Sequence, residues 1–153
     1  MRFLYKIKRI HRKIKWKIQR ANRGFSDYDT WDIDMWFIKT MKAMLEYFVE
    51  NTIGAPVRYG WTEENCHEEW RKYIKRMIFL LDEMDEDKCS YKNPYEEEYE
   101  NHCIERWGHE KTSKEEKLIN MYLGEEQNKR IYIENCKKEF FDMFSKVFYD
   151  LWD

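Results

Sequence analysis

The segment 62–86, which reads TEENCHEEWRKYIKRMIFLLDEMDE, decides the fold class of this sequence. Its apolar positions recur at spacings of four, three, four, three and four residues, which is the period of one face of an α-helix. These positions are Cys66, Trp70, Tyr73, Met77, Leu80 and Met84. Thr62 is followed directly by two glutamates, a pattern typical of a helix start. The segment is therefore predicted to be a long amphipathic helix.

Two further segments, at about 27–53 and 126–151, carry the same kind of spacing. In the first, Ser26 or Asp27 is expected to cap the helix, and Gly54 and Pro56 are expected to end it. Its predicted inner face consists of Trp31, Met35, Ile38, Met41, Leu45 and Phe48. In the second, the stripe consists of Ile133, Cys136, Phe140, Phe144, Val147 and Leu151. Trp31 and Trp70 are both expected in the core.

The part of the chain between the second and third long helices reads as an insertion, at about 88–124. A charged loop from Asp85 to Pro94 precedes a short acidic helix at 95–107, which is expected to stop at Gly108. A second short helix at 114–123 would begin at a capping box of Ser113 and Glu116 and end near Gly124. The predicted fold is all-α: an antiparallel bundle of three long helices with a short helical insertion and an N-terminal basic amphipathic helix.

The composition agrees with this fold class. Only 5 Gly and 2 Pro occur in 153 residues, so few turns are expected. Aromatic residues make up 18% of the chain and supply the burial that disordered chains lack. A chain of this length forms one domain that needs neither a disulfide nor a metal for stability.

The first 23 residues are unlike the rest. They contain ten Lys and Arg and no acid, whereas residues 24–153 carry 18 Lys and Arg against 30 Asp and Glu, a net charge of −12. Phe3, Ile7, Ile10, Ile14 and Ile18 form one apolar stripe in this basic helix. The break at 23–25 then separates residues 1–23 from a bundle domain at 24–153.

Three roles remain open for this helix. Its stripe could join the core while its cations neutralise the acidic body, it could follow the phosphates of nucleic acid or another polyanion, or it could lie on a membrane surface. The residues expected to bind a polyanion or partner are Arg9, Arg12, Lys13, Trp16 and Arg20.

The sequence predicts neither a metal site nor an active site. The four cysteines, Cys66, Cys89, Cys103 and Cys136, lack the paired spacing of zinc ligands. The acids from Asp27 to Asp34 do not match an EF-hand, and no phosphate loop, nucleophile elbow or zinc-protease motif is present. We expect no enzyme activity, no cofactor, reduced thiols and a cytoplasmic protein without a membrane span.

Aromatic residues next to arginines suggest a ligand site. Tyr59, Trp61 and Trp107 lie off the stripes or at helix ends, where a ring can stack on a base or simply pack at a helix junction. Guanidinium groups nearby could pair with phosphates. The predicted ligand-binding residues are Arg23, Arg58, Tyr59, Trp61, Arg106 and Trp107.

Two stretches resemble a family of small uncharacterised proteins of tailed phages. The first is RGFSDYDTWDID at 23–34, and the second is the ending FSKVFYDLWD at 144–153, closed by Leu-Trp-Asp. Residues 70–84 fit more loosely, and together the similar parts cover about a third of the chain. The long basic helix and the insertion depart from the family pattern. No established activity comes with this resemblance.

The resemblance implies a phage-type binding protein that counteracts host defence. In one form it is a homo-oligomer that sequesters a small nucleotide immune signal in the host cytoplasm. In another it inhibits a host protein or nucleic-acid complex through its basic helix, and in a third it is a virion or packaging component. Small phage proteins without catalytic motifs often act in such ways, which is an analogy and not a physical argument.

Overall fold

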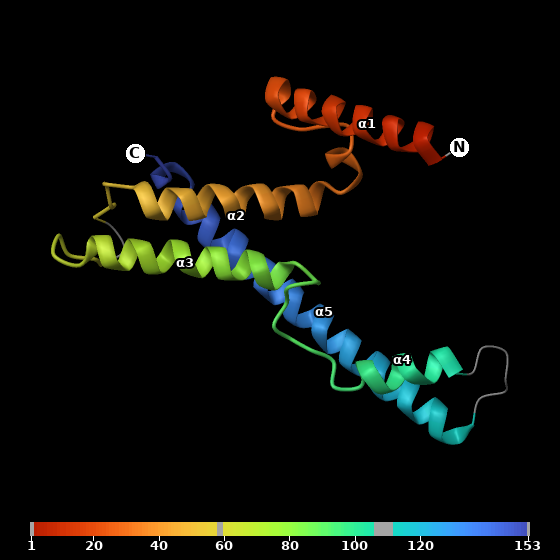
Figure 1. Cartoon of the computed structure of the whole chain (residues 1–153). Coiled ribbons are helices and arrows are strands. Elements are labelled where there is room, and N and C mark those ends of the chain that lie inside the picture. Colours follow the sequence, from red (N-terminus) through yellow and green to blue (C-terminus); the bar gives the residue numbers. More distant parts are fainter. Residues whose placement is uncertain (1, 58–59, 106–111, 153) are drawn as a thin grey trace. The chain divides into compact units, whose positions relative to one another are not determined.

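The computed structural model describes residues 2–57, 60–105 and 112–152, and side chains within 6–57, 60–101 and 112–152. In these ranges every regular element is a helix and none is a strand, so the predicted all-α class is confirmed. Two compact units are present, Met1–Met41 and Lys42–Asp153. Figure 1 shows the elements of both. Within the described residues, no helix combines the length and apolar character needed to cross a membrane.

The first unit contains α1 (Arg2–Arg23), the short 3₁₀ helix η1 (Asp29–Trp31) and the start of α2 (Ile33–Asn51). The predicted basic helix is confirmed as α1. It ends at Gly24, whose φ of 81° lies in the left-handed region and whose N–H donates to the carbonyl of Arg20 at 2.9 Å. This is a common helix ending that glycine adopts without strain.

The predicted start of the second long helix was wrong. α2 begins at Ile33, six residues later than expected, and neither Ser26 nor Asp27 caps it. The backbone carbonyl of Asp32 instead accepts from Trp36 N–H at 2.9 Å. Trp31 was expected in the core, yet it lies in η1 and is 90% exposed. The end of α2 at Asn51, just before Gly54, agrees with the prediction.

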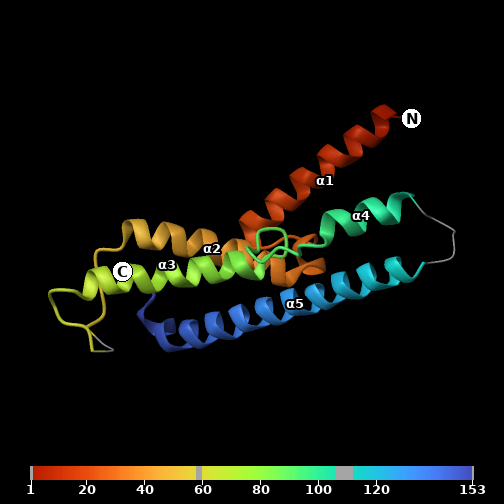
Figure 2. The ribbon, with the colours of Figure 1, turned by 90° about the horizontal axis from the view of Figure 1, so that it is seen from below.

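The second unit is built on the packing of α3 (Cys66–Met84) against α5 (Ser113–Val147), the two elements of this unit with the most extensive contact. Figure 2 shows α3 alongside the C-terminal part of α5. Tyr73 Oη donates to the carbonyl of Met143 at 3.0 Å. Apart from Cys89, the most fully buried apolar side chains come from these two helices and are Trp70, Ile74, Met77, Leu80, Leu81, Phe140 and Val147. Trp70 is thus a core residue, as predicted.

The rest of α2 belongs to the same unit. Leu45 and Val49 are buried, and Lys42 Nζ donates to Asp82 Oδ1 of α3 at 2.7 Å. Phe48 meets Trp70 edge to face, with ring centroids 6.2 Å apart. The three long helices therefore exist and make packing contacts, while their antiparallel three-helix arrangement stays a prediction.

The predicted break at Gly124 was wrong, because 113–147 is one continuous helix. Gly124 is an ordinary helical residue, and side chains of the preceding loop bind the helix on both sides of it. Asn93 Nδ2 donates to the carbonyl of Tyr122 at 3.0 Å and to Glu126 Oε1 at 2.9 Å. These contacts offset the roughly 1 kcal/mol that a mid-helix glycine costs. The capping box consists of Thr112 and Glu115, one residue earlier than predicted.

A short helix, α4 (Glu96–Glu105), packs on the first part of α5. The rings of Tyr99 and Tyr122 stack at 3.9 Å between centroids. The helix predicted at 95–107 is confirmed as far as Glu105, and its expected stop at Gly108 lies outside the described residues. A second short 3₁₀ helix, η2 (Phe148–Asp150), follows α5.

Candidate functional site

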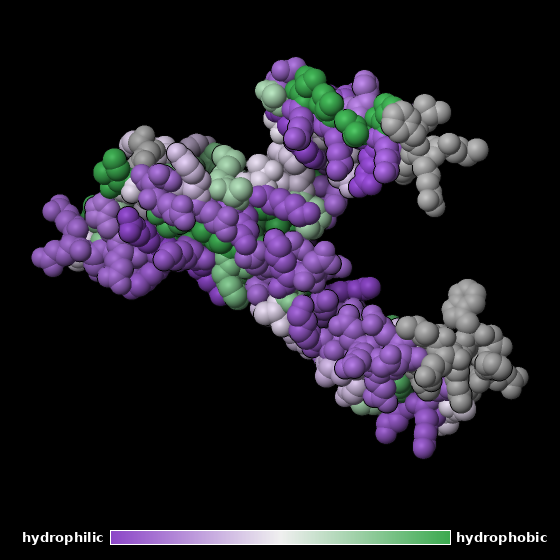
Figure 3. Space-filling view, viewed as in Figure 1, coloured by the Kyte–Doolittle hydropathy of each residue, from purple (hydrophilic) through white to green (hydrophobic). Residues whose placement is uncertain are grey.

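The basic helix α1 has two different sides. Successive residues turn by about 100°, so Ile7, Ile10, Ile14 and Ile18 occupy one narrow strip and most arginines lie opposite it. These four isoleucines are 47–58% exposed, and none belongs to the buried core. In Figure 3 the apolar side chains of α1 form a row bordered by hydrophilic residues. Among the described residues of the first unit, none covers this row.

The segment that follows α1 folds back onto its cationic side. Arg20 Nε donates to Asp29 Oδ2 at 2.9 Å, and a second guanidinium nitrogen donates to Oδ1. Ser26, which is fully buried, donates to the same carboxylate from its N–H at 2.7 Å and its hydroxyl at 2.9 Å. The hydrogen bonds from Arg20 hold the pKa of Asp29 well below its usual range. Asp29 therefore anchors the returning segment to α1 through a charged side chain.

Asp27 makes a second anchor on this side. Its carboxylate accepts from Gln19 Nε2 at 2.7 Å, from Lys15 Nζ at 2.9 Å and from the guanidinium of Arg23. Led by the Gln19 hydrogen bond, these donors lower the pKa of Asp27 far below its ordinary value. Both anchors lie on the side of α1 away from the isoleucines, since Arg20 is roughly 160° around the helix from Ile18.

The five residues predicted to bind a polyanion share this side of α1. Two of them are engaged: Arg20 with Asp29, and Trp16 with Tyr28, whose ring centroid lies 4.9 Å away. Arg9, Arg12 and Lys13 are exposed and make no hydrogen bond or ion pair with any residue that the structure describes. The N-terminal half of α1 therefore presents three uncommitted cations on successive turns.

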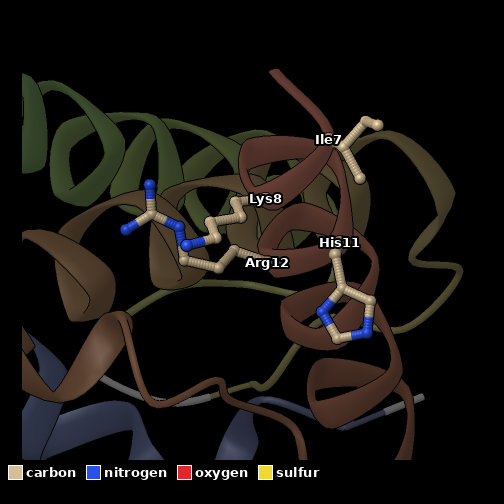
Figure 4. Close-up of a pocket in the computed structure, with 4 residues that line it drawn as sticks. All are labelled: Ile7, Lys8, His11 and Arg12. Atoms are coloured by element: carbon tan, nitrogen blue, oxygen red, sulfur yellow. The ribbon is translucent and has the colours of Figure 1, made fainter. Parts of the chain in front are cut away.

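A hollow of about 520 Å³ borders α1 where its two sides meet. The side chains that line it, among those the structure describes, are Ile7, Lys8, His11 and Arg12. Figure 4 shows Lys8 and Arg12 extending in one direction from the helix, with Ile7 and His11 on the adjoining side. Sequence reasoning missed Lys8 and His11, although their spacing from Ile7 would have placed them at the border of the stripe.

The predicted nucleotide-binding residues are only partly described. Arg58, Tyr59, Arg106 and Trp107 lie outside the described residues or side chains. Trp61 is half-buried and contacts two other rings, with centroids 6.3 Å from Trp70 and 6.1 Å from Tyr73. Arg23 binds the Phe25 carbonyl at 3.0 Å as well as Asp27. Arg23 and Trp61 belong to different units.

A buried polar cluster in the second unit stabilises the loop after α3. Glu83, 3% exposed, accepts from the N–H of Ser90 at 2.9 Å and from its hydroxyl at 2.8 Å. Burial opposes the charge of Glu83, but these hydrogen bonds outweigh it and lower its pKa. Cys89 Sγ lies 3.7 Å from the same carboxylate, and burial raises the pKa of the Cys89 and Cys136 thiols. Such thiols are weak nucleophiles, so the surroundings of Cys89 and Cys136 favour packing over reactivity.

In the described part of the chain, no three His, Cys, Asp or Glu side chains lie together in a way that could bind a metal ion. No protein-family model matches this sequence, and searches of curated proteins and of solved structures found no similar chain. The resemblance to tailed-phage proteins therefore stays a prediction, and the candidate site rests on α1 alone.

Proposed function

We propose that the protein is a non-catalytic binding protein that engages a phosphate-bearing polyanion through the arginine side of α1. The observation that carries this proposal is the set of three exposed cations, Arg9, Arg12 and Lys13, which have no acidic partner among the described residues. Phosphate oxygens are the natural partners of such a surface, since they can pair with guanidinium and ammonium groups without a shaped pocket.

The rest of the molecule serves as the scaffold in this proposal. Asp27 and Asp29 hold the C-terminal half of α1, which leaves its N-terminal half to the partner. The second unit, with the predicted antiparallel packing of α2, α3 and α5, would carry contacts that are specific to a host target. With the phage resemblance, the biological role is to counteract host defence by occupying a nucleic-acid complex in the host cytoplasm.

The test is the salt dependence of nucleic-acid binding. Fluorescence anisotropy would compare full-length protein with the variant Arg9→Ala/Arg12→Ala/Lys13→Ala on labelled duplex and single-stranded oligonucleotides between 50 and 200 mM salt. Each lost phosphate contact reduces the slope of log K against log salt by about 0.9 on duplex DNA, so a decrease of roughly 2–3 is expected. The loss should be similar for all base sequences.

The matched control removes three exposed lysines from the second unit, Lys114→Ala/Lys117→Ala/Lys138→Ala. It makes the same change in net charge away from α1. Equal effects of the two triple variants, or no binding by the unaltered protein at 50 mM salt, would reject the proposal.

A second candidate function is the sequestration of a small nucleotide by a homo-oligomer. What favours it is the number of exposed rings that could stack on a base: Trp31, Tyr149, Trp152 and Tyr47 are 90%, 83%, 73% and 71% exposed. Titration calorimetry with cyclic nucleotides and ADP-ribose derivatives, together with native mass measurement, tests it. No heat of binding at high micromolar ligand would remove this candidate.

A further inference from the structure

We infer that the isoleucine stripe of α1, Ile7, Ile10, Ile14 and Ile18, docks on the surface of a membrane with anionic headgroups, with Lys6, Lys8 and Lys17 beside it at the level of the phosphates. This surface lies on the side of the helix opposite Arg9 and Arg12, while Lys13 lies nearer to its edge, about 60° around the helix from Ile10. The inference is therefore independent of the proposed polyanion binding.

The stripe has the dimensions of an interfacial helix face. Four isoleucines over 12 positions of α1 cover about 17 Å along the helix axis. Each keeps about half of its surface exposed, and no polar residue interrupts the strip. The returning segment contacts α1 through Lys15, Trp16, Gln19, Arg20 and Arg23. The first unit thus leaves its own apolar face uncovered.

Lysines border the stripe on both sides. Lys6 and Lys17 lie along one edge and Lys8 along the other, and all three are exposed with no ion pair among the described residues. A lysine in this position can lay its alkyl chain along the apolar face and extend its ammonium group to a headgroup. Attraction by anionic lipid then adds to the burial of the isoleucines.

The positive charge of α1 distinguishes between the possible binding partners of the isoleucine stripe. A second copy of α1 would bring ten cations against ten cations with no acid in either helix, which disfavours a stripe-to-stripe dimer. A nucleic-acid duplex would satisfy the cations but leave four isoleucines in water. An anionic lipid surface satisfies both, and a helix that is strongly sided, cationic and low in mean hydropathy is typical of proteins that lie on such a surface without crossing it.

The experiment is co-sedimentation of the full-length protein with sucrose-loaded vesicles at 150 mM salt. Vesicles of phosphatidylcholine alone are compared with vesicles that contain 30% phosphatidylglycerol. Binding to the anionic vesicles at least about tenfold tighter than to the neutral ones is expected from several cations near the surface. The variant Ile10→Gln/Ile14→Gln should lose at least tenfold in binding to the anionic vesicles.

The matched control is Leu123→Gln/Ile131→Gln, which changes two apolar residues of α5 that are 54% and 50% exposed. This control should bind vesicles like the unaltered protein, and circular dichroism should show the same helix content in all three proteins. Because Arg9→Ala/Arg12→Ala/Lys13→Ala alters two residues opposite the stripe and one near its edge, it should weaken oligonucleotide binding more than vesicle binding. A failure of one proposal can thus be told from a failure of the other.

Three outcomes would overturn the inference. The first is no binding of the unaltered protein to anionic vesicles even at 50 mM salt. The second is equal vesicle binding by the unaltered protein and Ile10→Gln/Ile14→Gln, which would leave only electrostatic attraction. The third is a loss of oligonucleotide binding in that variant with vesicle binding intact, which would assign the stripe to a nucleic-acid complex.

Discussion

α1 and α3 have the same spacing of apolar residues, but only α3 buries its stripe within its own unit. In α3, Trp70 is 1% exposed and Met77 is fully buried, whereas in α1, Ile10 and Ile14 are 58% and 51% exposed. The polar residues differ as well. α3 carries both signs of charge, and its Arg76 pairs with Glu139 of α5 through bonds of 2.7 and 2.8 Å. α1 carries cations alone.

This difference shows that the spacing of apolar residues in a helix and the presence of a surface that covers them are separate properties. A repeat of three and four residues determines which side of a helix is apolar. Whether that side is covered depends on what the neighbouring elements offer. The aromatic side chains and mixed charges of α3 match α5, while the isoleucines and lysines of α1 match no element of their own unit.

The largest difference in stability between the two stripes is expected when one residue of each is truncated. Trp70→Ala removes a fully packed ring, so we expect the free energy of unfolding to fall by about 3–5 kcal/mol. Ile14→Ala, on the exposed stripe, should change it by no more than about 0.5 kcal/mol. Urea unfolding followed by far-ultraviolet circular dichroism measures both. Equal destabilisation would show that the two stripes are buried alike.

The buried carboxylate of Glu83 should make the stability of the second unit depend on pH. Glu83→Gln replaces charged hydrogen bonds from Ser90 with neutral ones, and a loss of about 1.5–3 kcal/mol is expected at pH 7. The pKa of Glu83 in the folded protein lies below its ordinary value of 4.5. Its contribution is therefore complete above about pH 4.5 and disappears as the pH falls through the lower folded value.

The measurement is the free energy of unfolding of both proteins from pH 7 down to pH 3. The difference in free energy of unfolding between the unaltered protein and Glu83→Gln should become smaller as the pH falls. Glu116→Gln, at an exposed position of α5, serves as the control and should follow the unaltered protein at every pH. A difference that stays constant with pH would contradict the assignment.

The smallest effects on stability are expected when one glycine of each unit is replaced by alanine. Gly124 is an ordinary helical residue, and a Cβ added there meets nothing within 4 Å. Gly124→Ala should therefore raise the free energy of unfolding by about 0.5–1 kcal/mol. Gly24 has a φ of 81°, so Gly24→Ala should weaken the turn after α1 by about 1 kcal/mol. Thermal unfolding of the two variants measures these opposite signs, and a destabilising Gly124→Ala would indicate a real bend in α5.

The sequence could predict the helices but not all of their ends. Stripes at three-and-four spacing located α1, α3 and the C-terminal part of α5, because that period depends only on backbone geometry. The start of α2 was missed because Asp27 and Asp29 bind cations of α1, a choice made by tertiary contacts. Gly124 predicts a helix end because glycine is a poor helix former, whereas the contacts of Asn93 that keep the helix continuous come from a loop distant in the sequence.

The candidate site was predictable in part. The excess of cations in residues 1–23 pointed to α1, and its polyanion-binding residues do share one side. Which of them remain uncommitted was not predictable, since it depends on Asp29 and Tyr28 occupying Arg20 and Trp16. The lysines that border the stripe were overlooked because they stand out only once the stripe is known to be exposed.

The unbroken course of α5 has a consequence for local opening. Its 35 residues extend for about 52 Å, and different neighbours protect different parts of it. α3 covers the C-terminal part, while the short helix α4 covers the N-terminal part. One helix can therefore show two levels of amide-hydrogen protection. Slow exchange is expected near Phe140, and faster exchange near Tyr122, where α4 and its preceding loop contact α5 through stacked rings and through hydrogen bonds from Tyr91 and Asn93.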